Sequence, residues 1–274
     1  MELNTVHHAI IVMASVLAIL IIIRVVWALS LIKISGDVGF AKTCGSRERQ
    51  EDCHIVKRSF RGTLAVLADG MGRNQGGSVS SSLAVETVLD VFDRDNPFLN
   101  PNYFFQNAFR QANNRILDRL SDCYGGASVA IALFDRKTLY YALAGNVQIA
   151  VFRGHDLVQI TEGHTVNVLA EKKYTVGSLT KQETISLLRE RRLYNYVGRD
   201  EFCDVEIFDA PVHLRQGDIV VLMTDGVYES VPHTDIEKIL SSVRGCQEKA
   251  NAIIKAVDEF DGIKDNASVV LIAI

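Results

Sequence analysis

Most apolar residues of this chain gather in short runs that end at turn residues. Such runs predict strands at 54–58, 63–68, 128–134, 138–144, 147–152, 219–223 and 267–274. Apolar residues at helical spacing predict helices over 78–92, 102–120, 234–242 and 246–259. The three central strands follow one another through short connections, which favours antiparallel pairing. Strands grouped with strands predict an α+β layered domain rather than a doubly wound parallel sheet.

A different pattern occupies residues 9–32, which are almost entirely apolar and contain one charged residue, Arg24. Because a membrane-spanning helix needs ~20 apolar residues, this run predicts a single N-terminal transmembrane helix that enters the lipid bilayer. A signal peptide is the first alternative, but the first eight residues hold no Lys or Arg. A buried helix of the folded domain is the second, but an all-round apolar helix is unusual at a terminus.

Charges beside this run predict its orientation. No cation precedes it, whereas four follow it closely: Lys33, Lys42, Arg47 and Arg49. The excess of cations on one side predicts a single-pass membrane protein whose C-terminal body is cytoplasmic. The sequence is therefore divided into an anchor at 1–35 and one domain at 36–274, since neither a linker nor a repeat interrupts the second part.

The composition of the chain excludes some classes of binding partner. The chain is 48% hydrophobic and 23% charged, as expected for a folded domain with a core. Its net charge is −4 and its cations form no stripe, which disfavours nucleic acid as a partner. The five cysteines are scattered without a CxxC pair, which is typical of reduced thiols rather than of a zinc site.

Candidate chemistry lies in acidic residues where the apolar runs stop. Asp69 follows the run at 63–68, Asp225 follows the run at 219–223, and Asp265 precedes the last run. Asp52 precedes the run at 54–58, with Glu51 beside it. Carboxylates brought together need cations to neutralise them, and hard oxygen ligands favour Mg²⁺ or Mn²⁺. Asp-Gly is also a common turn dipeptide, so the spacing alone leaves both interpretations open.

Short motifs along residues 40–274 occur in one characteristic order. They are Arg47-x-x-x-Glu51-Asp52, Ala68-Asp69-Gly70-Met71-Gly72, Gly125-Gly126-Ala127-Ser128, Ala144-Gly145-Asn146, Thr161-Glu162-Gly163-His164-Thr165, Val197-Gly198-Arg199, Thr224-Asp225-Gly226-Val227 and Asp265-Asn266-Ala267-Ser268. In this order they resemble the protein phosphatase 2C family of metal-dependent protein phosphatases (PPM), in its short bacterial form.

The resemblance implies a four-layer sandwich, in which two packed antiparallel sheets are flanked by helices. It also implies two Mn²⁺ or Mg²⁺ ions that activate a water for hydrolysis of phosphoserine and phosphothreonine in protein substrates. Asp69 would bridge the ions and Asp225 and Asp265 would hold the first. Glu51 and the Gly70 carbonyl would hold the second, with Asp52 close by. Arg47 would bind the phosphate, because a guanidinium engages two oxygens at once.

Two departures from the family pattern stand out. Asn146 replaces an aspartate associated with a third ion, so the third site is expected to be weakened, and Arg73 replaces a glycine. They motivate an alternative function: a catalytically weak, membrane-tethered module that binds phosphoproteins. A further alternative keeps the enzyme but restricts it to one regulatory partner. His164 is a candidate general acid, against a structural role in a turn. The basic stretch 187–195 is expected to be a solvated helix face or flap.

Overall fold

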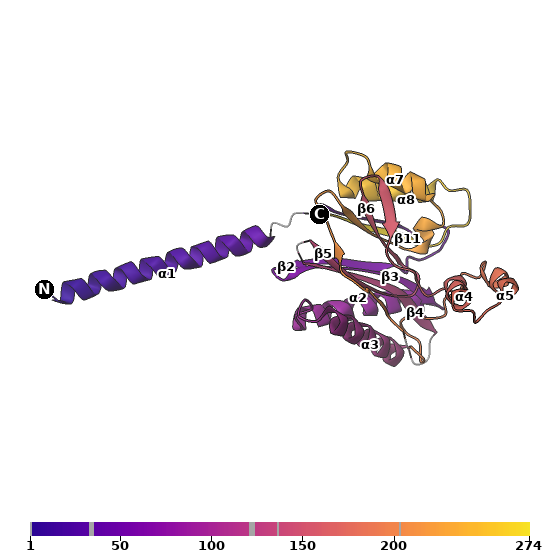
Figure 1. Cartoon of the computed structure of the whole chain (residues 1–274), viewed down its shortest axis with the longest axis horizontal. Coiled ribbons are helices and arrows are strands. Elements are labelled where there is room, and N and C mark those ends of the chain that lie inside the picture. Colours follow the sequence, from indigo (N-terminus) through magenta and orange to yellow (C-terminus); the bar gives the residue numbers. More distant parts are fainter. Residues whose placement is uncertain (1, 33–35, 121–123, 136, 203) are drawn as a thin grey trace.

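The computed structural model describes residues 2–32, 36–120, 124–135, 137–202 and 204–274, without the side chains of 2–7, 9–10 and 26–32. Within these residues, two antiparallel sheets pack face to face between two pairs of helices (Figure 1). This arrangement confirms the predicted sandwich of two sheets flanked by helices.

The first sheet has the order β1-β11-β10-β6-β7 in the described residues. Its strands are β1 (Val38–Thr43), β6 (Gln148–Arg153), β7 (Asp156–Gln159), β10 (Ile219–Met223) and β11 (Ala267–Ala273). Helices α7 (His233–Leu240) and α8 (Cys246–Asp258) cover its outer face and bury an apolar layer that includes Val221, Ile253 and Leu271. A short helix, α6 (Asp225–Tyr228), follows β10 directly.

The second sheet has the order β2-β3-β4-β5-β8, and β9 also pairs with β5. Its strands are β2 (Cys53–Ser59), β3 (Gly62–Gly72), β4 (Gly125–Asp135), β5 (Thr138–Ala144), β8 (Glu206–Ile207) and β9 (Val212–His213). Helices α2 (Gly76–Arg94) and α3 (Pro101–Arg119) cover its outer face. A third apolar layer, which includes Leu67, Ile149 and Val270, fills the space between the sheets.

The chain changes sheets between β5 and β6, which the sequence did not reveal. β4 and β5 pair as predicted, but β6 pairs with β10 and β7 in the other sheet. Gly145 turns the chain at a φ of 116°, a conformation that favours glycine. The Ser128 hydroxyl then accepts hydrogen bonds from the backbone N–H groups of Asn146 and Val147, at 2.7 and 2.9 Å.

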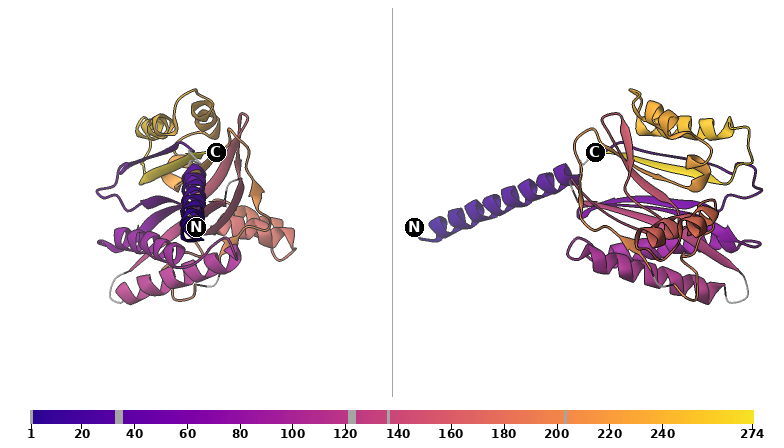
Figure 2. Two further views of the ribbon diagram at one scale, coloured as in Figure 1. Left: turned by 90° about the vertical axis from the view of Figure 1, so that its left-hand side faces the viewer. Right: turned by 45° about the vertical axis from the view of Figure 1, so that its right-hand side comes forward.

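Residues 165–195, here called the flap, leave the sandwich beside this turn. The flap contains α4 (Val166–Thr175) and α5 (Lys181–Leu187), which project from the end of the sandwich opposite to α1 (Figures 1 and 2). An isolated antiparallel bridge between Thr165 and Leu193 closes the base of the flap. The predicted flap at 187–195 is therefore found, although α5 ends at Leu187 and the basic residues after it are not helical.

The predicted membrane anchor is wrong. Residues 2–32 form one helix, α1 (Glu2–Ile32). Nowhere in the described part of the chain is a helix both long and apolar enough to traverse a bilayer. Three further expectations depended on that span and are not supported either. They are the bilayer contact, the single-pass topology and the cytoplasmic orientation. The predicted boundary at 35 and 36 borders residues 33–35, which lie outside the described residues.

Candidate metal and phosphate site

The acidic residues selected from the sequence come from both sheets and lie at the same end of the sandwich. Asp225 opens α6 immediately after β10, and Asp265 lies two residues before β11. Glu51 and Asp52 precede β2. Asp69 was expected at a strand end, but β3 continues through Gly72 and pairs Asp69 with Ser128 of β4. A rigid, centrally paired strand thus presents this carboxylate.

Asp69 lies within the field of the other aspartates of the cluster. Burial raises the pKa of Asp69 well above its usual value, and the charges of Asp225, Asp52 and Asp265 raise it further. Those three carboxylates therefore lie within electrostatic range of Asp69. Such a group of carboxylates is stable as an anionic cluster only when cations compensate it.

Asp52 is the most deeply buried member, with 4% of its surface exposed. Burial raises its pKa to about 6. Its Oδ2 accepts a long hydrogen bond from the Thr224 hydroxyl at 3.4 Å, whereas its Oδ1 is buried without a hydrogen-bond partner among the described residues. A buried carboxylate oxygen without a donor is costly, and a cation or an ordered water is the kind of group that satisfies it.

Asp225 has a protein partner at the position of one family departure. The Asn146 side chain donates a hydrogen bond from Nδ2 to Oδ2 of Asp225 at 2.9 Å. Burial raises the pKa of Asp225 to about 6, and the charge of Asp265 adds to this rise. Tyr228, three residues further along α6, donates to the Asn146 carbonyl at 3.0 Å. Asn146 is therefore fixed from two sides with its amide against Asp225.

Arg47 and Asp265 form a bidentate ion pair, although 218 positions separate them. Nε and one terminal nitrogen of Arg47 donate to the two oxygens of Asp265 at 2.8 and 2.6 Å. This contact raises the pKa of the guanidinium. The Arg47 side chain is still 62% exposed, so the cation expected to bind phosphate lies at the surface of the cluster.

Glu51 lies against the start of α2, which explains the small residues there. A Cβ on Gly77 would lie 2.6 Å from Cδ of Glu51, and the Ser81 hydroxyl donates to the Glu51 carbonyl at 2.5 Å. Burial raises the pKa of Glu51. Gly70 is equally confined, since a Cβ there would lie 2.2 Å from the Gly77 oxygen and 2.6 Å from the Glu51 oxygen. Close backbone approach, rather than a positive φ, requires glycine at position 70.

The oxygen atoms of these residues are suitable ligands for a divalent ion. They are carboxylates and one carbonyl, which are hard oxygen ligands, and they include the partnerless Oδ1 of Asp52. In the described part of the chain, however, no three His, Cys, Asp or Glu side chains converge tightly enough to form a ready-made metal site. Asp265 is instead engaged by Arg47, and Asp225 by Asn146. The assignment of individual ligands therefore stays a prediction.

Two supporting residues were not selected from the sequence. The Asn266 side chain accepts a hydrogen bond from the Glu51 N–H at 2.7 Å and donates to the carbonyls of Cys44 and Arg49. It therefore joins the loop that carries Glu51 to the loop that carries Asp265. Thr224 donates to Asp52 and accepts from the Ser268 N–H at 2.9 Å. Both residues belong to the motifs quoted above, but side-chain bonds between distant loops leave no periodic signal.

The other candidates have simpler surroundings. The ring Nδ1 of His164 accepts a hydrogen bond from the Gly145 N–H at 3.0 Å, which supports the structural role in a turn. Burial lowers the pKa of His164 and so favours the neutral ring. Arg73 is exposed, and the next residue, Asn74, has a positive φ of 59°.

Comparison with known proteins decides the family. The model of the family described as Stage II sporulation protein E (SpoIIE) matches residues 60–274. The chain belongs to the SpoIIE family of PPM phosphatases. It is 26% identical to the serine/threonine phosphatase stp of Listeria monocytogenes over 216 residues, which cover 76% of this chain and 83% of that protein.

Solved structures of phosphatases share its fold. The serine/threonine phosphatase of S. agalactiae superimposes with a TM-score of 0.75 at 19% identity, covering 87% of this chain and 99% of that one. The catalytic domain of the phosphatase PstP, solved with two manganese ions, gives 0.67 at 23% identity, covering 87% and 99%. At these identities the superpositions establish the fold. None of these comparisons favours the catalytically weak binding module.

Proposed function

We propose that residues 36–274 form a protein-serine/threonine phosphatase that hydrolyses phosphoserine and phosphothreonine with the help of Mn²⁺ or Mg²⁺. The observation that carries this proposal is the cluster of Asp52, Asp69 and Asp225, whose pKa values burial raises together. Only bound cations would make such a cluster favourable in its ionised form. Family membership gives the reaction, since named relatives of similar length are serine/threonine phosphatases.

Each residue has a role in this proposal. Two ions would be held by Asp69 between them, by Asp225 and Asp265 on one side, and by Glu51 and the Gly70 carbonyl on the other. When bound, such ions lower the pKa of water and neutralise charge on the phosphate.

Asp52 would lie close to the two ions and contact them through a water at its partnerless Oδ1. Arg47 binds two phosphate oxygens with the nitrogens that engage Asp265 in the structure. The substrate is a phosphorylated protein.

Asn146 should affect how tightly a third ion could bind. Its amide nitrogen faces Asp225 and donates to it, so this position presents a donor where a carboxylate would present a charge. A third cation would therefore be held weakly in this chain. Asn146→Asp should increase turnover at limiting Mn²⁺ if a third ion assists the reaction. Unchanged turnover at every Mn²⁺ concentration would remove that argument.

The direct test uses the full chain and a phosphothreonine peptide. Hydrolysis should require added Mn²⁺ or Mg²⁺, should stop in excess EDTA, and should fall at least 100-fold in Asp69→Asn, the range that loss of a central electrostatic group produces. Activity that persists in EDTA would contradict the proposal. Tight peptide binding without turnover at saturating Mn²⁺ would instead favour the binding module.

A further inference from the structure

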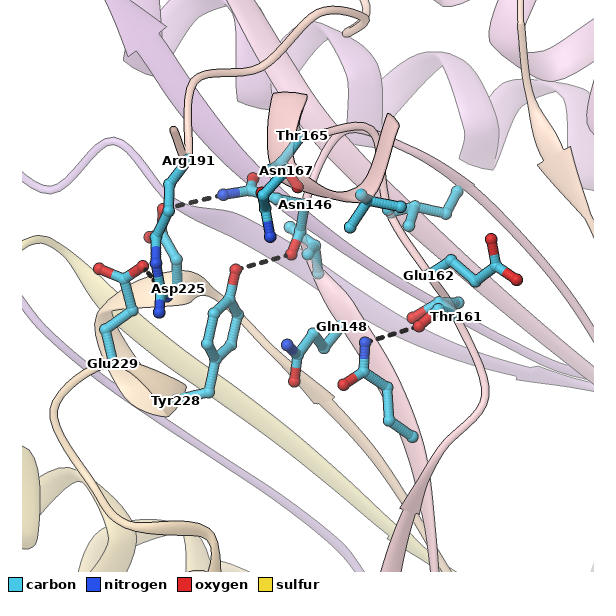
Figure 3. A pocket seen from close by; sticks show the side chains of 15 residues that line it. Asn146, Gln148, Thr161, Glu162, Thr165, Asn167, Arg191, Asp225, Tyr228 and Glu229 are labelled. Atoms are coloured by element: carbon cyan, nitrogen blue, oxygen red, sulfur yellow. Dashed lines mark hydrogen bonds and ion pairs between the residues drawn. The ribbon is translucent and has the colours of Figure 1, made fainter. Parts of the chain in front are cut away.

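A pocket of about 250 Å³ lies between the flap and the sandwich, and its wall includes Asn146 and Asp225 (Figure 3). The pocket therefore adjoins the candidate catalytic site. This volume is below the ~300 Å³ at which pockets for drug-sized ligands begin. Its size suits one long side chain that enters from a substrate held at the site.

Several polar groups in this pocket have no partner of their own. The Asn167 Oδ1 is buried without a hydrogen-bond partner among the described residues. Within the same part of the chain, the side chains of Gln148 and Thr165 also line the pocket and make no hydrogen bond. Tyr228 is different, because its hydroxyl is used by the Asn146 carbonyl. A buried acceptor such as Asn167 Oδ1 calls for an incoming N–H donor.

The charged residues that line the pocket indicate which kind of hydrogen-bond donor can enter it. Glu162, Asp225 and Glu229 line the pocket against one cation, Arg191. Arg191 and Glu229 pair on one side of the pocket at 2.6 Å, and Glu162 lies on the opposite side (Figure 3), where Lys172 reaches it from outside the lining. These side chains are 44–68% exposed, and exposed ion pairs hold their partners weakly. Because Asp225 belongs to the metal site, Glu162 and Glu229 are the lining carboxylates that a ligand could engage, and their weakly held partners favour an incoming cation over an acidic group.

We propose that this pocket is a specificity subsite that receives a lysine or arginine side chain close to the phosphorylated residue of the substrate. The ammonium or guanidinium donates to Asn167 Oδ1 and to the oxygen of the Gln148 carboxamide, and it lies between the carboxylates of Glu162 and Glu229. The inference rests on the proposed phosphatase function. In this proposal Asn167 of the flap and Gln148 of β6 help to select the substrate. They take no part in the hydrolysis itself.

The test compares phosphothreonine peptides that carry a single arginine at successive flanking positions with peptides that carry citrulline, its neutral isostere. At one position, arginine should raise kcat/KM about tenfold over citrulline, as a hydrogen bond to a charged group does. Equal rates at all positions, or a preference for glutamate, would overturn the subsite while leaving the phosphatase intact. Failure to hydrolyse any peptide or p-nitrophenyl phosphate with Mn²⁺ would overturn both.

Substitutions locate the effect. Gln148→Lys should remove the arginine preference, and Asn167→Asp, which is nearly isosteric, should increase it. Gln106→Lys, which places the same charge on the exposed face of α3, is the matched control and should leave the preference unchanged. Hydrolysis of p-nitrophenyl phosphate, which has no flanking residue to place in the pocket, should be the same in all variants. If Gln148→Lys lowered that rate as much as the peptide rate, Gln148 would not be a specificity residue.

Discussion

The ionised carboxylate of Asp52 should destabilise the metal-free fold, so that Asp52→Asn stabilises it. Asp52 is 4% exposed, and burial raises its pKa from 3.8 to about 6. An acid whose pKa is higher in the folded state binds more protons folded than unfolded, so its contribution to stability falls as pH rises from about 4 to 6. A shift of roughly two pKa units corresponds to about 3 kcal/mol at pH 8.

Urea unfolding in excess EDTA measures this effect. Asp52→Asn should raise the free energy of unfolding by up to about 3 kcal/mol at pH 8 and by about half as much at pH 5, where the wild-type carboxyl is mostly protonated. Asp118→Asn, on the exposed surface of α3, is the matched control and should change little at either pH. Added Mn²⁺ should stabilise the wild type more than the variant. If Asp52→Asn destabilised the protein equally at both pH values, the reasoning about the buried charge would be refuted.

Three further predictions concern single contacts. Gly70→Ala should lower phosphatase activity more than tenfold, because its Cβ would lie 2.2 Å from the Gly77 oxygen, and unchanged activity would show that the two backbones separate freely. Tyr228→Phe should cost about 1 kcal/mol in urea unfolding through the lost bond to Asn146, and no loss would mean that water replaces the hydroxyl. Arg153→Met should cost about 3 kcal/mol at pH 7, because Asp218 is 3% exposed and accepts from Arg153 at 2.6 Å. Burial raises the pKa of Asp218, the hydrogen bond from Arg153 lowers it, and the net shift is downward. The destabilisation by Arg153→Met should therefore shrink as pH falls through this lowered pKa. A destabilisation that does not change with pH would contradict the ion pair.

Much of the fold was predictable because its strands and helices are long and regularly patterned. The predicted strand at 219–223 and helix at 246–259 match β10 and α8 to within one residue. β8 and β9 were missed because two residues carry no alternation. The crossing from β5 to β6 was missed because it depends on one backbone angle at Gly145 and on the Ser128 hydroxyl, neither of which changes the hydrophobic pattern.

The site was predictable in its residues but not in its contacts. The order of motifs selected Asp69, Asp225 and Asp265, which lie within electrostatic range of one another. The pairing of Arg47 with Asp265 and of Asn146 with Asp225 joins positions 218 and 79 residues apart, and a single sequence contains no record of such pairs. The pocket depends on how the start of the flap is placed beside β6 and α6, which local pattern does not determine.

Metal-ion titration combined with turnover tests the central claim most directly. Calorimetric titration of the full chain with Mn²⁺ should show binding of two ions, and dephosphorylation of a phosphothreonine peptide should rise over the same Mn²⁺ range. Asp69→Asn should lose tight binding and turnover together, whereas Asp118→Asn should keep both. Full turnover in Asp69→Asn, or turnover in the wild type before any Mn²⁺ is bound, would contradict the account.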